Sequence, residues 1–188
     1  MKLTGGRARG RRLRKPRIDG LRPTSARLRE ALFDVLGSRI HGASFLDVFA
    51  GTGAIGLEAL SRGASRAVFI ESDRRAARVI AANLALAGVA DSARIVEGDA
   101  VGALRDLRRS GERFDIVFLD PPYAADLLER ATPAAAGLVR SRGVLVVEHA
   151  SRRRLDTTAL QGLRRGRRYV HGDSVLSVLH DDGPTAGT

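Results

Sequence analysis

The stretch FLDVFAGTGAIGLEALSRGASRAVFIESD, residues 45–73, decides the fold. Its pattern predicts a buried strand over 45–49, a turn with Gly51, Gly53 and Gly56, a helix, and a strand over 67–70 that ends at Glu71. Glycines let the backbone turn sharply and approach a ligand closely, and the helix behind them presents free N–H groups at its N-terminus. The stretch therefore predicts part of a nucleotide-binding βαβ unit.

Two carboxylates in this stretch bear on which nucleotide binds. Glu71 lies 20 residues after Gly51, where an acidic side chain can accept hydrogen bonds from ribose hydroxyls. Asp47 lies inside the apolar strand, where a carboxylate is costly unless a cation or several donors meet it. This favours S-adenosylmethionine, which carries an ammonium and a sulfonium, over NAD. In the alternative interpretation Asp47 ends the strand and accepts N–H groups of the turn.

Composition limits the remaining possibilities. The 188 residues suffice for one domain with a small appendage, and the absence of cysteine excludes disulfides and thiol catalysis. The four histidines show no metal-ligand spacing, so we expect no metal and read them as structural or surface residues. No apolar run approaches the length of a membrane span, and no apolar segment follows the charged N-terminus. We therefore expect a cytoplasmic monomer that does not contact a membrane.

The net charge of +11 is concentrated at the N-terminus. Residues 1–30 contain eleven Lys or Arg and two acidic residues, a net charge of +9. A localised basic segment is typical of a nucleic-acid contact, although a solvated basic tail is the alternative. We expect residues 1–22 to form a basic hairpin or arm that projects from the domain and binds RNA through Arg7, Arg9, Arg11, Arg12, Arg14, Lys15, Arg22 and Arg27. The first turns of the next helix carry Arg22, Arg27 and Arg29, so we expect this helix to pack on the domain while its start faces a phosphate.

The rest of the chain alternates helices and strands. After a helix capped by Thr24 or Ser25 and the βαβ stretch, the pattern predicts helices over 74–87, 101–109 and 126–139 and strands over 93–96, 114–119, 144–148, 167–170 and 174–179. This alternation predicts an α/β fold, a mostly parallel sheet covered on both faces, with a C-terminal antiparallel hairpin at one edge. The domain is expected over 23–181, followed by a disordered tail over 182–188.

Acidic residues follow several of the expected strands. Asp47, Glu71, Asp99 and Asp120 are expected to converge on one crevice, because ligands of such sheets bind outside the carboxyl ends of the strands. Asp99 is placed to meet the adenine end of the cofactor or, equally, to cap the next helix.

The most specific motif is Asp120-Pro121-Pro122-Tyr123, directly after an apolar strand. Two prolines force a rigid, extended backbone, so the Asp120 carboxylate and the Pro121 carbonyl can face one point. Two such acceptors can hold the two N–H groups of an exocyclic amine on a nucleobase, and Tyr123 can stack on the base. The alternative is a rigid turn with Tyr123 as packing.

These motifs resemble the RsmD family of bacterial 16S rRNA guanine-N2 methyltransferases. The resemblance covers the chain to about residue 180 and rests on GGRARGRRL, LRPTSARLREALFDVL, FLDVFAGTGAIGLEALSRGA, the FIESD strand end and DPPY. It implies a Rossmann-like class I methyltransferase with a seven-stranded sheet and a small N-terminal β-hairpin. The implied reaction transfers a methyl group from S-adenosylmethionine to N2 of a guanine in 16S rRNA, in the small ribosomal subunit or a late precursor, and leaves S-adenosylhomocysteine.

The resemblance also assigns roles to residues. Asp120, Pro121 and Tyr123 are the implied catalytic residues, and the implied cofactor site comprises Asp47, Phe49, Gly51, Gly53, Glu71, Ser72, Asp99, Ala100 and Asp120. EHASRRR, from Glu148, replaces a more acidic run expected after the fifth strand, which leaves His149 and the arginines at 152–154 without a clear role beyond a second RNA contact.

The residues themselves do not distinguish guanine N2 from adenine N6, so an adenine-N6 methyltransferase of DNA or RNA stays an alternative. A noncatalytic RNA-binding or assembly protein is another. We also expect removal of residues 1–20 to weaken RNA binding and its salt dependence, with little change in cofactor affinity.

Overall fold

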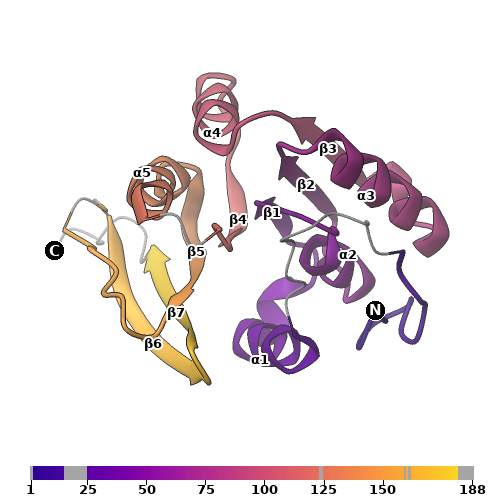
Figure 1. Cartoon of the computed structure of the whole chain (residues 1–188), viewed down its shortest axis with the longest axis horizontal. Coiled ribbons are helices and arrows are strands. Elements are labelled where there is room, and N and C mark those ends of the chain that lie inside the picture. Colours follow the sequence, from indigo (N-terminus) through magenta and orange to yellow (C-terminus); the bar gives the residue numbers. More distant parts are fainter. Residues whose placement is uncertain (1, 15–24, 123–124, 159, 161, 182–188) are drawn as a thin grey trace, which may run out of the picture. The chain divides into compact units, whose positions relative to one another are not determined.

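The computed structural model describes residues 2–14, 25–122, 125–158, 160 and 162–181 (Figure 1). The chain divides into two compact units, Met1–Ala100 and Val101–Thr188. The seven strands run in the order β3-β2-β1 in the first unit and β4-β5-β7-β6 in the second. The predicted α/β fold, mostly parallel with a C-terminal antiparallel hairpin, is confirmed.

The first unit is a parallel three-stranded sheet with helices packed on it. Its elements are α1 (Ala26–Leu36), the 3-10 turn η1 (Gly37–Ile40), β1 (Ser44–Val48), α2 (Ala54–Ser61), β2 (Arg66–Glu71), α3 (Arg74–Ala87), the 3-10 turn η2 (Ala90–Ser92) and β3 (Ala93–Glu97). Every residue of β1 is buried, as its apolar run predicts for a strand covered on both faces. Ser25 caps α1 by accepting the Leu28 N–H, as the sequence allowed.

Helix α2 lies unusually close to β2. All eight of its residues are buried, and it packs against β1 and β2. A Cβ atom added at Gly56 would lie 2.3 Å from the Phe69 ring of β2, so only glycine allows this approach. The third glycine of the turn therefore serves packing between helix and strand, as in dinucleotide-binding units.

The second unit contains α4 (Ala100–Arg109), β4 (Phe114–Leu119), α5 (Ala125–Ala136), β5 (Val139–Ala150), β6 (Leu163–His171) and β7 (Ser174–Asp181). Strands β4 and β5 are parallel, and β7 runs antiparallel to both β5 and β6. Three predicted boundaries were wrong. The helix expected to reach Val139 ends at Ala136, and β5 starts at Val139, where it pairs with Phe114 before a register shift. Strand β6 starts four residues before the predicted Arg167, because its exposed arginines hide the strand pattern.

The N-terminal arm does not project as expected. Residues 2–14 fold back on themselves through an antiparallel bridge between Lys2 and Arg12, and their apolar side chains are buried. Leu3, Ala8 and Leu13 are only 2%, 3% and 5% exposed. The arm is therefore amphipathic: three apolar side chains face inward, and its arginines are exposed.

The arm touches the end of α2 through its glycines. Gly6 has φ of +72°, and a Cβ there would lie 1.8 Å from the Ser61 carbonyl oxygen. The N–H groups of Arg7 and Ala8 donate to the Ser61 carbonyl and hydroxyl at 2.8 and 2.9 Å. The polar composition of residues 1–22 led us to expect an arm that projects from the domain. Composition does not reveal this docking, because the glycines make their contacts through backbone atoms alone.

None of the helices in the described ranges is long and apolar enough to cross a lipid bilayer.

Candidate functional site

The glycine turn of the first unit is held by Glu71. One carboxylate oxygen accepts the Gly51 N–H at 2.7 Å, and the other accepts the Asp73 N–H at 2.8 Å. Glu71 is 8% exposed at the end of β2. Because each carboxylate oxygen can accept more than one hydrogen bond, both keep capacity for hydroxyl donors of a ribose.

Asp47 fixes the start of α2. Its carboxylate is 1% exposed and accepts the Gly56 N–H at 2.9 Å, in the first turn of the helix. This satisfies one of the orphan donors of the helix and places negative charge at its positive end. The geometry matches the alternative in which Asp47 accepts N–H groups of the turn, so Asp47 orients the glycine turn that a cofactor would meet.

Four more predicted cofactor residues, Phe49, Ser72, Asp99 and Ala100, follow the three parallel strands of the first unit, whereas Asp120 follows β4 in the second unit. Phe49 follows β1 with φ of +66°, a conformation that costs a non-glycine residue energy and is enriched at functional sites. Ser72 and Asp99 are exposed after β2 and β3, and Ala100 begins α4. The Gly98 N–H donates to the Glu71 carbonyl at 3.0 Å, which brings the turn before Asp99 against the end of β2.

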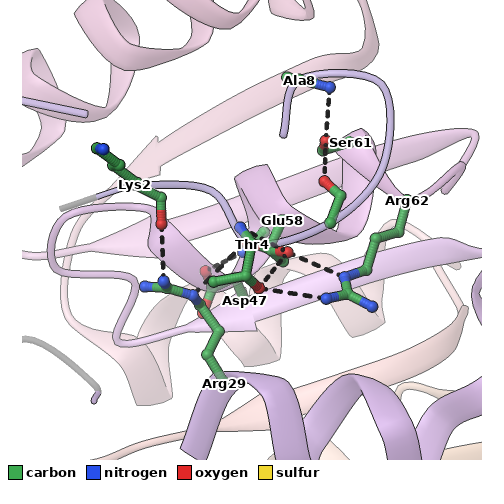
Figure 2. A network of polar contacts seen from close by, with 10 residues as sticks. Lys2, Thr4, Ala8, Arg29, Asp47, Glu58, Ser61 and Arg62 are labelled. Carbon is green, nitrogen blue, oxygen red and sulfur yellow. Dashed lines mark hydrogen bonds and ion pairs between the residues drawn. The ribbon is translucent and has the colours of Figure 1, made fainter. Parts of the chain in front are cut away.

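A buried polar network joins α2 to the arm and to α1 (Figure 2). Glu58 of α2 is fully buried and accepts from the Thr4 N–H and hydroxyl and from Arg62 Nε at 2.8–3.1 Å. Arg29 of α1 is 1% exposed, lies 3.6 Å from Glu58 and donates to the Lys2 carbonyl at 2.8 Å. The sequence led us to expect that the start of α1, including Arg29, faces a phosphate. Arg29 is instead buried and hydrogen-bonded to the arm.

Asn83 of α3 makes a second connection between the arm and the glycine turn. Its side-chain oxygen accepts the Arg14 N–H at 2.7 Å, and its amide donates to the carbonyls of Arg14 and Thr52 at 3.1 and 3.3 Å. Asn83 is fully buried, and Thr52 lies between Gly51 and Gly53. One side chain thus bonds the end of the arm to the turn.

The second unit carries the Asp-Pro-Pro motif in a pocket. Asp120, Pro121 and Pro122 follow β4 and line the pocket. The other lining residues come from α5, β5, the loop after it and β7, namely Leu128, Glu148, His149, Ala150, Arg153 and Ser174. Tyr123 lies outside the described residues, as do Lys15 and Arg22 of the predicted RNA-binding set.

Comparison with known proteins identifies the family. Residues 1–180 match the family model described as conserved hypothetical protein 95, the RsmD family of rRNA methyltransferases. The chain belongs to this family. The sequence-based prediction of RsmD membership is therefore confirmed.

Similarity to individual proteins supports the assignment to the RsmD family. The chain is 46% identical over 129 residues to ribosomal RNA small subunit methyltransferase D of Escherichia coli K12, a match covering 69% of this chain and 63% of that protein. The namesake from Haemophilus influenzae Rd is 38% identical, with 70% and 68% covered. The solved structure of E. coli yhhF, named as a candidate methyltransferase, superposes with a TM-score of 0.86 at 36% identity, covering 98% and 99% of the two chains.

Glu148 is a pocket residue to which the RsmD resemblance assigned no role. Burial and the neighbouring Asp120 carboxylate raise the pKa of Glu148 to about 8, against the hydrogen bond that Ser174 donates. The sequence offered one signal, since Glu148 ends an apolar strand in the same way as Glu71. Its significance depends on Asp120 being its neighbour, which the sequence does not reveal.

His149 has a structural environment. Its ring is 6% exposed and bonds to the Ser177 hydroxyl at 2.8 Å and to the Ala150 carbonyl at 3.0 Å. Burial lowers its pKa, aided by Arg168, Arg165 and Arg153, which favours the neutral ring. This agrees with the expectation that the histidines are structural or surface residues.

Exposed arginines form two basic surfaces in this RsmD-family chain. In the first unit the exposed members of the predicted RNA-binding set are Arg7, Arg9, Arg11, Arg12, Arg14 and Arg27. Arg11 is also tethered, because its guanidinium donates to the Leu86 carbonyl. In the second unit β6 exposes Arg164, Arg165, Arg167 and Arg168. We did not single out these four from the sequence, because we located the basic charge by the net charge of residues 1–30.

Proposed function

We propose that this protein transfers a methyl group from S-adenosylmethionine to the exocyclic N2 of a guanine in 16S rRNA, in the small ribosomal subunit or a late precursor. The observation that carries the proposal is the Asp120-Pro121 pair, which lines a pocket at the end of β4 in a chain of the RsmD family. The names of the E. coli and H. influenzae relatives support an rRNA of the small subunit as substrate.

The first unit fits the cofactor. Glu71 has acceptor capacity for the ribose hydroxyls, the glycine turn allows close approach, and the exposed Ser72 and Asp99 follow the neighbouring strands β2 and β3. Asp47 holds the N-terminus of α2 behind the turn. When bound, S-adenosylmethionine supplies an electrophilic methyl group on a positively charged sulfur.

The second unit fits an amine on a nucleobase. Asp120 and the Pro121 carbonyl would each accept one N–H of the amine, which directs the nitrogen lone pair out of the plane of the base. Positioning then provides most of the rate acceleration, because methyl transfer neutralises charge rather than creating a new anion. The proton that the nitrogen loses after methylation passes to the Asp120 carboxylate or to water. A paired base cannot reach such a pocket, so the target must be unpaired or flipped out.

Two alternative functions can be distinguished from this proposal by the product that forms or by its absence. An adenine-N6 methyltransferase of DNA or RNA would use the same acceptor pair, and a noncatalytic RNA-binding or assembly protein would keep the fold without turnover. The basic arm supports an RNA partner in every case.

The test is incubation of the full-length protein with small ribosomal subunits that lack the modification and with S-adenosylmethionine labelled in its methyl group, followed by digestion of the RNA. We expect labelled N2-methylguanosine, absent with Asp120→Ala and present with the control Asp126→Ala, an exposed position on α5. Label on adenine or on DNA would support the second enzyme. No label, together with no calorimetric binding of S-adenosylhomocysteine, would support the noncatalytic protein.

A further inference from the structure

Glu148 lies beside Asp120, although the proposed reaction gives it no role. Strands β4 and β5 are parallel and pair Leu119 with Val147, so Asp120, directly after β4, is the neighbour of Glu148, two residues before the end of β5. Both side chains line the same pocket and share a hydrogen bond, and Ser174 at the start of β7 donates a second hydrogen bond to Glu148. Glu148 thus contacts the group proposed to hold the target amine.

One oxygen of Glu148 indicates its protonation state. Within the described residues Oε2 is buried and has no hydrogen-bond donor. An ionised oxygen in that position would be desolvated without compensation, next to a second carboxylate. A proton on the carboxyl oxygen that is hydrogen-bonded to Asp120 lowers both penalties, because that O–H donates to Asp120 and Oε2 becomes the carbonyl oxygen of a neutral group.

The other charged groups around the pocket allow this arrangement. Arg153 lines the pocket from the loop after β5, and the Ser174 hydroxyl favours the charged form of Glu148. His149 is engaged by Ser177 and Ala150, and burial lowers its pKa, which favours its neutral form. Desolvation and Asp120 nevertheless dominate and raise the pKa of Glu148 to about 8, so a pair with one proton exists at neutral pH.

We infer that Glu148 is a positioning residue that keeps its proton and donates it in a hydrogen bond to Asp120, so that the Asp120 carboxylate is fixed and ionised for the amine. The inference rests on the proposed function. During transfer the nitrogen lone pair forms the N–C bond, the C–S bond pair returns to sulfur, and the extra proton on nitrogen moves to Asp120. Glu148 itself stays protonated throughout.

The inference has a specific pH signature. When Glu148 loses its proton, two carboxylates repel each other in the pocket and Asp120 moves, so kcat falls as the pH rises through about 8. Glu148→Gln replaces the O–H donor by an N–H donor that does not titrate, so this fall disappears. Ser174→Ala removes a bond that favours the charged form, which shifts the fall to higher pH.

The experiment measures kcat and KM for methylation of small ribosomal subunits between pH 6 and 9. At pH 7 we expect Glu148→Ala to lower kcat between about 10-fold and 100-fold with little change in KM, and Glu148→Gln to recover most of the loss. Glu129→Ala, at an exposed position on α5, is the matched control. A kcat for Glu148→Gln as low as that of Glu148→Ala, or an unchanged fall in kcat above pH 8, would overturn the inference.

A second readout does not require activity. The infrared C=O band of a protonated carboxyl group should be present in the wild-type protein at pH 7, decrease as the pH passes 8, and be missing in Glu148→Gln. If the wild type has this band but methylates no guanine, the proposed function fails and the proton-sharing pair stands. If guanine is methylated and the band is missing, the pair fails and the function stands.

Discussion

Glu71 connects two turns with one carboxylate, because it accepts N–H groups from Gly51 after β1 and from Asp73 after β2. A cofactor ribose would therefore meet an acceptor that is already ordered, and little conformational entropy is lost on binding. This argument concerns the affinity for the cofactor rather than the rate of transfer.

Replacing Glu71 should weaken cofactor binding. Loss of a charged acceptor for hydroxyl donors costs about 1.5–3 kcal/mol, so Glu71→Ala should raise the Kd for S-adenosylhomocysteine by about 10-fold to 100-fold in calorimetry. Glu97→Ala is the matched control, since Glu97 pairs with Glu71 in the sheet but is exposed. Equal Kd values for the two variants would contradict the assignment of Glu71.

Glu148 should also make stability depend on pH. The pKa of Glu148 is raised in the folded state, so its stabilising proton is fully present below the usual glutamate pKa of 4.5 and is lost as the pH rises through about 8. The free energy of unfolding should fall across this window by at most ~1.4 kcal/mol per pH unit for this group. Urea unfolding of the wild type and Glu148→Gln at pH 5, 7 and 9 tests this, and identical pH profiles would contradict it.

At the scale of elements, α2 is held from two sides. Glu71 and Asp47 fix its first turn and the preceding glycines, whereas Glu58 and Ser61 fix its second half to the arm. Docking of the arm and the shape of the glycine turn are therefore properties of the same helix.

The buried pair of Arg29 and Glu58 should be costly to break. Both side chains are almost completely buried, and removal of one partner leaves an uncompensated charge. Glu58→Ala should lower the free energy of unfolding by about 3–5 kcal/mol in urea titration. Arg109→Ala, which breaks an exposed pair with Asp106 on α4, should change it by less than about 1 kcal/mol. Similar effects of the two substitutions would show that the network contributes little.

The sequence led us to expect that the arm affects RNA binding and has little effect on cofactor affinity. The connection through Asn83 changes this expectation, because it bonds the arm to the glycine turn. Asn83→Ala breaks the bonds from α3 to Arg14 and Thr52 and leaves a buried carbonyl without its donor. We expect it, and deletion of residues 1–14, to weaken S-adenosylhomocysteine binding as well as RNA binding. A loss of about 1–3 kcal/mol in stability should accompany Asn83→Ala.

Calorimetry on folded protein, with the exposed Arg78→Ala of α3 as control, measures this effect. Cofactor affinities that match the wild type in both variants would restore the original expectation that the arm affects RNA binding alone.

At the scale of the whole molecule, the basic residues lie on an arm in the first unit and on an edge strand in the second. Each Arg that contacts a phosphate releases counterions and adds roughly 0.7–0.9 to the slope of log K against log salt. Arg167→Gln with Arg168→Gln on β6, and Arg7→Gln with Arg9→Gln on the arm, should each reduce the slope for binding to small ribosomal subunits. Arg109→Gln should not. A slope unchanged by the β6 pair would limit RNA contact to the arm.

Local patterns were sufficient for most of the fold. The buried runs of β1 and β4, the cap of α1 and the glycine turn all depend on residues near each other in the chain, so their prediction succeeded. Part of the site was predictable because the carboxyl ends of neighbouring parallel strands lie at the same edge of a sheet. As expected from this, Glu71 and the turn before Asp99 lie together.

The failures share a physical cause. Docking of the arm depends on partners 53–69 residues away in the sequence, and proton sharing by Glu148 depends on Asp120 in a different strand. A buried Arg29 and an exposed one look alike in the sequence, because only the position of Glu58 distinguishes them. The early start of β5 was missed because its pairing with β4 shifts in register between Phe114 and Ile116, and hydrophobic periodicity does not indicate such a shift.

The long separation between the arm and Asn83 also sets an order of events during translation. Arg14 is synthesised 69 residues before its partner Asn83, a delay of roughly 3–14 s at 5–20 residues per second. For that time the nascent chain displays a strongly cationic segment, with Leu3 and Leu13 unburied, beside the ribosome's own RNA. We therefore expect the arm to dock only after α2 and α3, which supply its hydrogen-bond partners Ser61 and Asn83, have been synthesised.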